Sequence, residues 1–199
     1  NSVNQLLEEE GCMVDSAISS TLAQGLAFIP SDVRDRTVIL VDIGHRFTAV
    51  SVLKGDGIVY HKTFPVGGLH VTKDLAMVLR VKEEIAQQLK QRAIYGLSIS
   101  TDDVYEVMEK GTYRLMRFPA AQVQEIINAR LEEICDIIKQ YLNKSGIILP
   151  EFVGVYLTGG TASMRGVREF MQKQLGRSVT LIQPKSTRLN KPDYSSALG

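Results

Sequence analysis

The chain has 199 residues, of which 44% are hydrophobic, and its 23 basic and 22 acidic side chains leave a net charge of +1. This length and composition suit one domain with a real hydrophobic core, with or without a smaller insertion. The near-zero net charge argues against a nucleic-acid-binding protein and gives no sign of an anionic membrane partner.

The two cysteines and the apolar segments indicate a cytoplasmic protein. Cys12 and Cys135 lie far apart and at no metal-ligand spacing, so reduced thiols are the simpler interpretation. No apolar run reaches the roughly 20 residues of a membrane span, and no secretory signal is visible. Because the chain starts at Asn1 and stops at Gly199 directly after an apolar segment, we expect a fragment of a longer protein.

Two helices are expected before the first strand. Residues 4–10 and 17–29 have helix-compatible composition and are separated by Gly11. The Pro-Ser-Asp sequence at residues 30–32 ends the second helix and leads into a charged connector at residues 34–36.

A three-stranded meander is expected next. Residues 37–41 are a continuous β-branched and aliphatic run, which is typical of a strand buried on both faces. Residues 47–53 and 58–64 follow as strands, joined by an Asp-Gly turn at residues 54–57. The Asp-Ile-Gly turn at residues 42–44 lies at one end of this meander.

After residues 65–68, the spacing of the apolar residues changes from every second residue, as in a strand, to about every 3.6 residues, as in a helix. Residues 69–79 and 82–93 are expected to be helices. Residues 96–118 are the least regular part, with one short strand at residues 113–118. Pro119 then opens a long amphipathic helix that reaches about Asn143.

The last part returns to alternating strands and helices. Residues 152–157 form an apolar strand that runs into Thr-Gly-Gly-Thr at 158–161. A helix over residues 165–175, a strand over 179–182 and a final helix from Lys191 follow. This alternation predicts an α/β domain, and the middle third is expected to be an inserted subdomain.

Two turns have the composition of ligand-binding loops. The turn at residues 42–48 could aim backbone amides at a phosphate, and its aspartate could hold a hydrated magnesium ion. The turn at residues 157–166 joins a strand, a glycine pair and a helix, so a ligand could approach the backbone and the helix N-terminus. A plain β-turn and a plain strand-to-helix turn remain the alternatives.

The order of these motifs resembles the superfamily of actin, Hsp70 and the sugar kinases. Residues 42–48 resemble its second phosphate loop, and residues 157–166 resemble its adenosine loop. Within the superfamily, the chain resembles FtsA, the bacterial actin homologue that tethers the division ring. The stretches that carry this resemblance are residues 64–68, 72–76 and 127–134.

The resemblance implies an α/β fold of the actin-like (RNase H-like) type, with the chain as domain II of the ATPase. Such a domain has a mixed sheet flanked by helices and an inserted smaller subdomain. Residues 1–36 would end domain I and include a connecting helix, and residues 191–199 would begin a second connecting helix at the hinge. Residues 37–68 and 123–199 would form subdomain IIA, and residues 69–122 would form subdomain IIB.

The resemblance also implies ATP and magnesium as cofactors. Asp42 would hold the metal through water, while Gln87 and Lys90 look like matches to a Glu and a Lys that reach the ribose and base in relatives. The implied cofactor-binding residues are Asp42, Gly44, Thr48, Gln87, Lys90, Gly159, Gly160 and Thr161.

Three departures from the family pattern bear on catalysis. The mildest is Gln87, which keeps the hydrogen-bonding ability of the family's Glu but loses its charge. His45 and Arg46 replace the second and third glycines of the phosphate loop, and a Cβ there crowds a bound phosphate. Many members begin the first connecting helix with Glu-Pro, where this chain has Ser20-Thr21. The carboxylate that helps to position the attacking water is therefore missing. No catalytic residue is assigned; weak ATPase activity is the most that is expected, and a metabolic enzyme is not.

The implied function is a scaffold that polymerises and anchors the tubulin homologue FtsZ at the inner face of the bacterial membrane. The FtsZ C-terminal tail would bind subdomain IIB, with Lys110, Arg114 and Arg117 as candidate contacts. Membrane contact would come through a segment outside this chain, and no nucleic acid is implied. The alternatives are PilM, whose second phosphate loop also lacks the triple glycine, and a sugar kinase. No catalytic aspartate motif for a sugar hydroxyl is visible in this half.

Overall fold

The computed structural model describes residues 2–96, 102–109, 111, 114–151 and 153–182. A five-stranded sheet in the order β3-β2-β1-β6-β7 forms its centre, and β4 pairs with β5 in a second sheet. The strands are β1 (Val38–Ile43), β2 (Thr48–Lys54), β3 (Gly57–Phe64), β4 (Val104–Glu109), β5 (Arg114–Pro119), β6 (Val155–Thr158) and β7 (Val179–Leu181). The helices are α1 (Ser2–Glu9), α2 (Ser20–Phe28), α3 (Ser31–Arg34), α4 (Gly68–Leu79), α5 (Glu83–Arg92), α6 (Ala120–Lys144) and α7 (Val167–Leu175).

The central sheet is mixed, and this confirms the expected fold class. Strands β1, β2 and β3 pair antiparallel as the predicted meander. Strands β6 and β7 are added parallel to β1. The register pairs Asp42 with Thr158, so β1 and β6 end at the same edge of the sheet. The two loops singled out in the sequence therefore start side by side.

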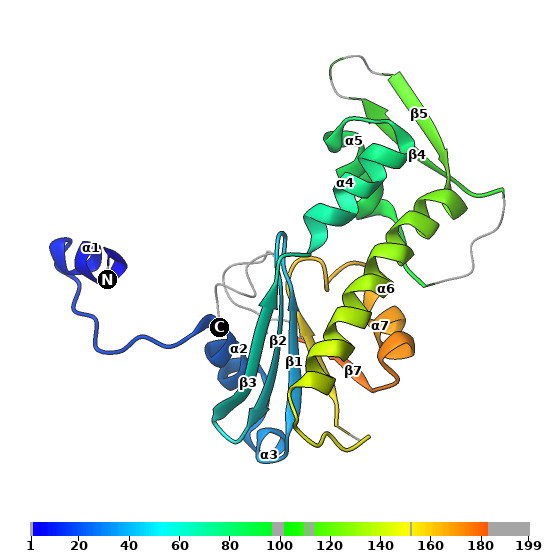
Figure 1. Cartoon of the computed structure of the whole chain (residues 1–199). Helices are drawn as coiled ribbons and strands as arrows, with labels where there is room; N and C mark the ends of the chain where they lie inside the picture. Colours follow the sequence, from blue (N-terminus) through cyan, green and yellow to red (C-terminus); the bar gives the residue numbers. More distant parts are fainter. Residues whose placement is uncertain (1, 97–101, 110, 112–113, 152, 183–199) are drawn as a thin grey trace.

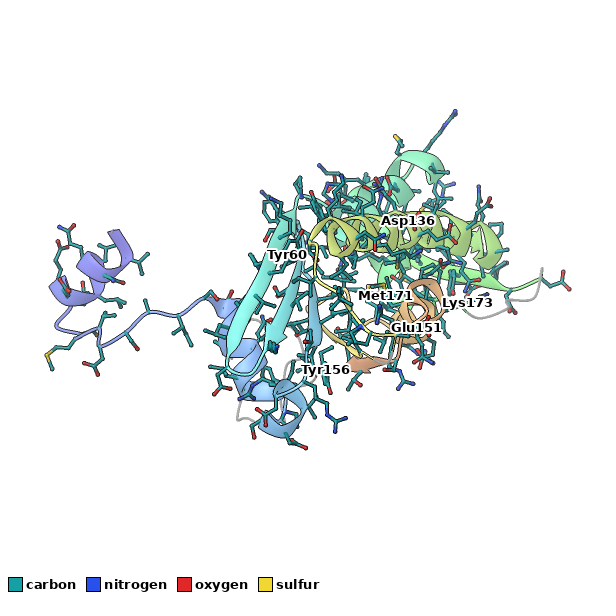
Figure 2. The ribbon with its side chains drawn as sticks, turned by 60° about the horizontal axis from the view of Figure 1, so that its bottom comes forward. Tyr60, Asp136, Glu151, Tyr156, Met171 and Lys173 are labelled. Carbon is teal, nitrogen blue, oxygen red and sulfur yellow. The ribbon has the colours of Figure 1, made fainter. Side chains whose placement is uncertain are left out.

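Each face of the sheet is covered by helices (Figure 1). Because successive side chains of a strand point to opposite faces, Ile39 and Val41 join the core cluster under α6 and α7. Leu40 joins the smaller cluster under α2 and α3. Tyr60 and Tyr156, labelled in Figure 2, pack against the first and the second cluster respectively.

Helix α2 lies unusually close to the sheet because Gly25 has no side chain. A Cβ added there would lie 2.4 Å from Leu53 Cδ2. The charged connector that follows is partly helical, as α3, and Arg34 is buried rather than solvated, with 7% of its surface exposed. Its guanidinium donates to the Ile29 carbonyl and to Asp56. The arginine caps the end of α2, where carbonyl groups lack helical partners.

Helix α6 confirms the long amphipathic helix predicted after Pro119. Ile127, Leu131, Ile134 and Ile138 follow helical spacing, and each is fully buried. Each such side chain contributes roughly 1.5–3 kcal/mol relative to an exposed one. Met171 of α7, labelled in Figure 2, is also fully buried and lies 3.1 Å from the Cys135 thiol of α6.

The short strand expected at residues 113–118 is confirmed as β5, but the prediction missed β4 in the same segment. Strands β4 and β5 form an antiparallel hairpin, with Val107 paired to Met116. The β4 sequence, Val-Tyr-Glu-Val-Met-Glu, lacks the strict alternation of apolar and polar residues that marks a strand, and pairing with β5 stabilises it. Figure 1 shows this hairpin with α4 and α5 at one end of the molecule, beyond the five-stranded sheet.

The expected final helix at residues 191–199 lies outside the described residues. Within the part of the chain that the structure describes, no helix is both long and apolar enough to cross a membrane.

Candidate functional site

The end of β1 brings Asp42 against the start of the β6–α7 loop. Strand alternation places Asp42 on the α2 face of the sheet, with Leu40. Gly159 packs directly on it, because an added Cβ would lie 2.4 Å from Asp42 Oδ1 and 2.5 Å from the Ile43 carbonyl oxygen. Gly159 also has a positive φ of 97°. Both observations require glycine at this position.

The two loops are joined by hydrogen bonds. The Thr161 amide donates to the Ile43 carbonyl at 3.1 Å. The Thr161 hydroxyl donates to the Gly44 carbonyl, also at 3.1 Å. The Gly44 amide closes its own turn by donating to the Phe47 carbonyl at 3.0 Å. The loops expected to contact phosphate and adenosine therefore form one connected unit.

The N-terminus of α4 is docked onto the same unit. The Gly68 amide donates to the Gly44 carbonyl at 3.0 Å, and the Leu69 amide donates to the His45 carbonyl at 2.7 Å. These bonds satisfy amides that the first turn of a helix leaves without partners. A Cβ on Gly68 would lie 2.3 Å from the Thr161 hydroxyl, and a Cβ on Gly67 would lie 2.7 Å from the Gly44 carbonyl.

A cavity with a volume of ≈ 570 Å³ opens beside this unit. It is lined by Gly44, His45, Gln87, Lys90, Gln91, Gly159, Gly160, Thr161, Ser163, Met164 and Arg165. Of the predicted cofactor-binding residues, the structure thus brings together Gly44, Gln87, Lys90, Gly159, Gly160 and Thr161. Residues from three separate parts of the chain line this cavity: the β1–β2 turn, α5 and the β6–α7 loop.

Lys90 is the most unusual residue of the cavity. Only 5% of its surface is exposed, and its Nζ donates to the Gly68 carbonyl at 2.9 Å. Burial lowers the pKa of its ammonium group to about 8. Among the described residues, no carboxylate forms an ion pair with it. A buried cation without a paired anion fits a site for a negatively charged ligand.

The neighbours of Lys90 add polar groups and positive charge. Gln87 accepts a hydrogen bond from the Thr72 hydroxyl at 2.8 Å, which fixes its side chain. The pKa of His45 is lowered by burial and by the nearby charges of Lys90, Arg46 and His70. The cavity therefore has a positive potential on the side of the phosphate loop.

Asp42 and Thr48 do not line the cavity. Thr48 is fully buried, and its hydroxyl donates to the Val66 carbonyl at 2.7 Å. Asp42 accepts a hydrogen bond from Gln24 Nε2 at 3.2 Å, and burial raises the pKa of its carboxyl group. Ser20, which the resemblance places at the start of the first connecting helix, lies exposed in the first turn of α2.

Gln24 is a site residue that the sequence interpretation missed. Its surface is 1% exposed, and its Oε1 is buried without a partner among the described residues. A polar side chain in an otherwise apolar helix segment was the signal that could have found it. An unsatisfied oxygen beside a buried carboxylate fits a hydrated magnesium ion, whose ligands are oxygen atoms and water. In the described parts of the chain, no group of three His, Cys, Asp or Glu side chains gathers as a direct metal site.

Comparisons with known sequences point to one family. The family model described as "Cell division protein FtsA" matches residues 39–199. FtsA of Bacillus subtilis (strain 168) is 32% identical over 196 residues, which is 97% of this chain and 44% of that protein. FtsA of Neisseria meningitidis serogroup B is 31% identical over 209 residues, which is 99% of this chain and 50% of that protein. The chain spans about half the length of the curated relatives that it matches.

Solved structures show the same fold at lower identity. MreB5 of Spiroplasma citri bound to ADP has a TM-score of 0.76 at 14% identity, over 98% of this chain and 62% of that one. EutJ of Carboxydothermus hydrogenoformans has a TM-score of 0.67 at 19% identity, over 98% and 58%. A PilM–PilN type IV pilus biogenesis complex has a TM-score of 0.69 at 18% identity, over 98% and 55%. These likenesses establish an actin-like fold.

Proposed function

Because the chain belongs to the FtsA family of cell division proteins, we propose that it forms one wall of an ATP-binding cleft in a polymerising scaffold that anchors FtsZ. The observation that carries this proposal is the cavity in which both glycine loops meet the buried Lys90. The family relation favours this cell-division role over the PilM and sugar-kinase alternatives.

ATP is the proposed ligand of the cavity. Gly44, Gly159 and Gly160 leave the backbone open to close approach, as phosphate and adenosine binding requires. Lys90 would offer its charge to a phosphate or ribose oxygen, and Gln87 would offer an amide. Two solved MreB5 structures with this fold hold AMPPNP and ADP. Magnesium would be held through water near Asp42.

We propose that bound ATP controls assembly of the protein and is hydrolysed only slowly. Ser20 supplies no carboxylate for the attacking water, and His45 and Arg46 occupy the turn where relatives have glycine. The positive charges of Arg46 and Lys90 would favour retention of an anion. Hydrolysis would therefore be slow, and closure of the cleft around ATP would control assembly into filaments.

The β4–β5 hairpin is the proposed contact for the FtsZ tail. Met108 lies opposite Leu115 in the hairpin register, and both are 49% exposed. Arg117 lies on the same face, opposite Glu106 and in an ion pair with it at 2.8 Å. This surface fits a peptide with apolar and acidic side chains. Of the other candidate contacts, Arg114 is exposed on β5, while Lys110 lies outside the described residues.

The remaining assignments follow from the same proposal. Residues 69–122 would act as subdomain IIB, between the two parts of subdomain IIA at residues 37–68 and 123–199. Residues 1–36 would belong to the end of domain I. The protein would work at the inner face of the bacterial membrane, through an anchor outside this chain.

One experiment on the full-length protein tests both binding functions. A fluorescent ATP analogue and a labelled FtsZ C-terminal tail peptide are titrated separately, and binding is measured by anisotropy. We expect wild type to bind both. The double variant Leu115→Ser/Arg117→Glu should lose peptide affinity by about tenfold or more, because it removes apolar area and reverses a charge. Its affinity for the nucleotide should stay within twofold of wild type.

Arg168→Glu on α7 is the matched control, because Arg168 is also exposed and paired to a neighbouring glutamate. It should bind both ligands like wild type. Wild-type protein that binds neither the nucleotide analogue nor the tail peptide would refute the proposal. Equal peptide affinities of the double variant and the control would refute the assignment of the hairpin.

A further inference from the structure

Tyr95, which follows α5, is a buried tyrosine that contacts two residues of the cavity wall. Only 1% of its surface is exposed. Its hydroxyl lies 3.3 Å from the Lys90 carbonyl and 3.1 Å from the Met164 sulfur, and it can donate its proton to either. Both Lys90 and Met164 line the cavity. The Tyr95 hydroxyl therefore joins the α5 side of the cavity to the β6–α7 side.

The backbone of Tyr95 is fixed to the same β6–α7 loop. Its amide donates to the Arg165 carbonyl at 2.9 Å. Gly166 has a positive φ of 84°, and a Cβ added to it would lie 2.1 Å from the Tyr95 carbonyl oxygen. Because only glycine permits both this φ and this close approach, the loop is built to pack on Tyr95.

Ile94, the residue before Tyr95, connects this contact to the β4–β5 hairpin and to α6. Its amide donates to the Tyr105 hydroxyl of β4 at 3.3 Å. Its carbonyl accepts a hydrogen bond from Gln124 Nε2 of α6 at 2.6 Å. No residue of the hairpin that the structure describes lines the cavity. Residues 94 and 95 therefore form a bridge of hydrogen bonds between the cavity wall and a hairpin that lies outside the cavity.

We propose that Tyr95 is a positioning residue that couples ligand binding in the cavity to the β4–β5 hairpin. Its hydroxyl holds Lys90 and Met164 in the arrangement that lines the cavity, and Ile94 passes this constraint to Tyr105. A ligand that orders the cavity wall then also orders the hairpin, and the coupling is reciprocal. This inference rests on the proposed nucleotide site, and it would let bound ATP influence the hairpin surface proposed for the FtsZ tail.

The test compares nucleotide affinity with amide hydrogen exchange of the hairpin in the full-length protein. The fluorescent ATP analogue is titrated by anisotropy. Exchange at residues 104–109 and 114–119 is then measured by mass spectrometry, without the analogue and at its saturating concentration. In wild type, we expect saturation to slow exchange in the hairpin about fivefold, which is the lower end of ordinary coupling between sites.

Two variants each remove one hydroxyl group from the bridge. Tyr95→Phe keeps the buried ring, and it should lower the affinity for the analogue about fivefold and abolish the slowing of the hairpin at saturation. Tyr105→Phe leaves the cavity wall intact, so its affinity should stay within about twofold of wild type while the slowing is also abolished. A general loss of stability would not separate affinity from hairpin exchange in this way.

Tyr141→Phe is the matched control. Tyr141 is a half-buried tyrosine of α6 whose ring packs on Phe64 at a centroid distance of 5.8 Å, and it does not line the cavity. This variant should keep the wild-type affinity and the wild-type slowing of the hairpin.

Each outcome decides a different point. If wild type binds the analogue without slowing exchange in the hairpin, the coupling is refuted and the proposed nucleotide site stands. If Tyr95→Phe keeps both the affinity and the slowing of wild type, the role of Tyr95 is refuted. If Tyr95→Phe does not fold, slowing that persists in Tyr105→Phe still refutes the bridge. If wild type binds no analogue at all, the nucleotide site is refuted and this inference falls with it.

Discussion

The buried charge of Lys90 lowers the stability of the folded protein. It is 5% exposed, and its pKa is about 8 rather than the ordinary 10.5 because burial removes water from the ammonium group. A lowered lysine pKa means that the unfolded chain binds the proton more tightly, so the charge destabilises the folded state below pH 8. The pKa difference corresponds to roughly 3 kcal/mol at neutral pH. Between pH 8 and 10.5 this cost disappears.

Replacing Lys90 by methionine should therefore raise stability and remove ligand binding. We expect Lys90→Met to have a higher Tm at pH 7 and an ATP-analogue affinity about tenfold or more below wild type. The wild-type affinity should fall as pH rises from 7 to 9, since Lys90 loses its proton near pH 8. Thermal unfolding and anisotropy titrations measure both effects.

Lys62→Met is the control, because Lys62 is exposed on β3. It should change neither the Tm nor the affinity appreciably. A Lys90→Met variant with wild-type affinity at pH 7 would contradict an anion-binding role for this residue.

At the scale of elements, α4 connects the site to the rest of the molecule. Its N-terminal amides bond to the phosphate-loop carbonyls of Gly44 and His45. Farther along, Asp74 receives two hydrogen bonds from Arg130 of α6, at 2.6 and 2.9 Å. The Arg130 side chain is 23% exposed, so solvent screens this paired contact only in part. A movement of the loop would be transmitted through α4 to α6.

Loss of the Arg130–Asp74 contact should weaken the protein measurably. We expect Arg130→Met to lower the free energy of unfolding by about 1–2 kcal/mol, because a two-bond, partly shielded ion pair is lost. Urea denaturation followed by circular dichroism measures the change. Arg168→Met, which removes an exposed pair with its sequence neighbour Glu169, should cost less than about 0.5 kcal/mol. Equal losses in the two variants would contradict a special role for Arg130.

The elements also differ in how far local sequence predicted them. Strands β1 to β3 and helix α6 are confirmed because their apolar residues repeat with one clear period and have clear turn or cap residues at their ends. Strand β4 was missed because its order depends on pairing with β5. Arg34 was placed in a charged connector without a predicted environment, and contacts at the end of α2 bury it.

At the scale of the whole molecule, the candidate site is assembled from distant segments. The β1–β2 turn, α5 and the β6–α7 loop line one cavity, and the start of α4 is hydrogen-bonded to the β1–β2 turn. Hydrogen bonds such as Thr161 to Gly44 join residues that are 117 positions apart in the chain. A ligand bound there would contact these three segments together, and it would stabilise the start of α4 through the β1–β2 turn.

Amide hydrogen exchange should show that these segments are protected together when a ligand binds. Adding magnesium and ATP to the full-length protein should slow amide exchange together in residues 43–48, 67–72, 87–91 and 159–165. The last turns of α6, at residues 139–144, serve as an internal control and should exchange as before. Mass spectrometry of peptic peptides measures each segment. Protection confined to one of the four segments would contradict a shared cavity.

The sequence by itself determined most of the elements, their order and the family pattern, because these depend on local periodicity and on turn residues such as Gly44 and Gly159. It also identified most of the residues that line the cavity. Only the tertiary structure decided which polar groups are buried, since burial depends on neighbours that are remote in the chain. The fold buries the cation of Lys90, and it places Gln24 in hydrogen-bonding contact with Asp42. Thr48 became part of the support behind the site, with its hydroxyl bound to the Val66 carbonyl.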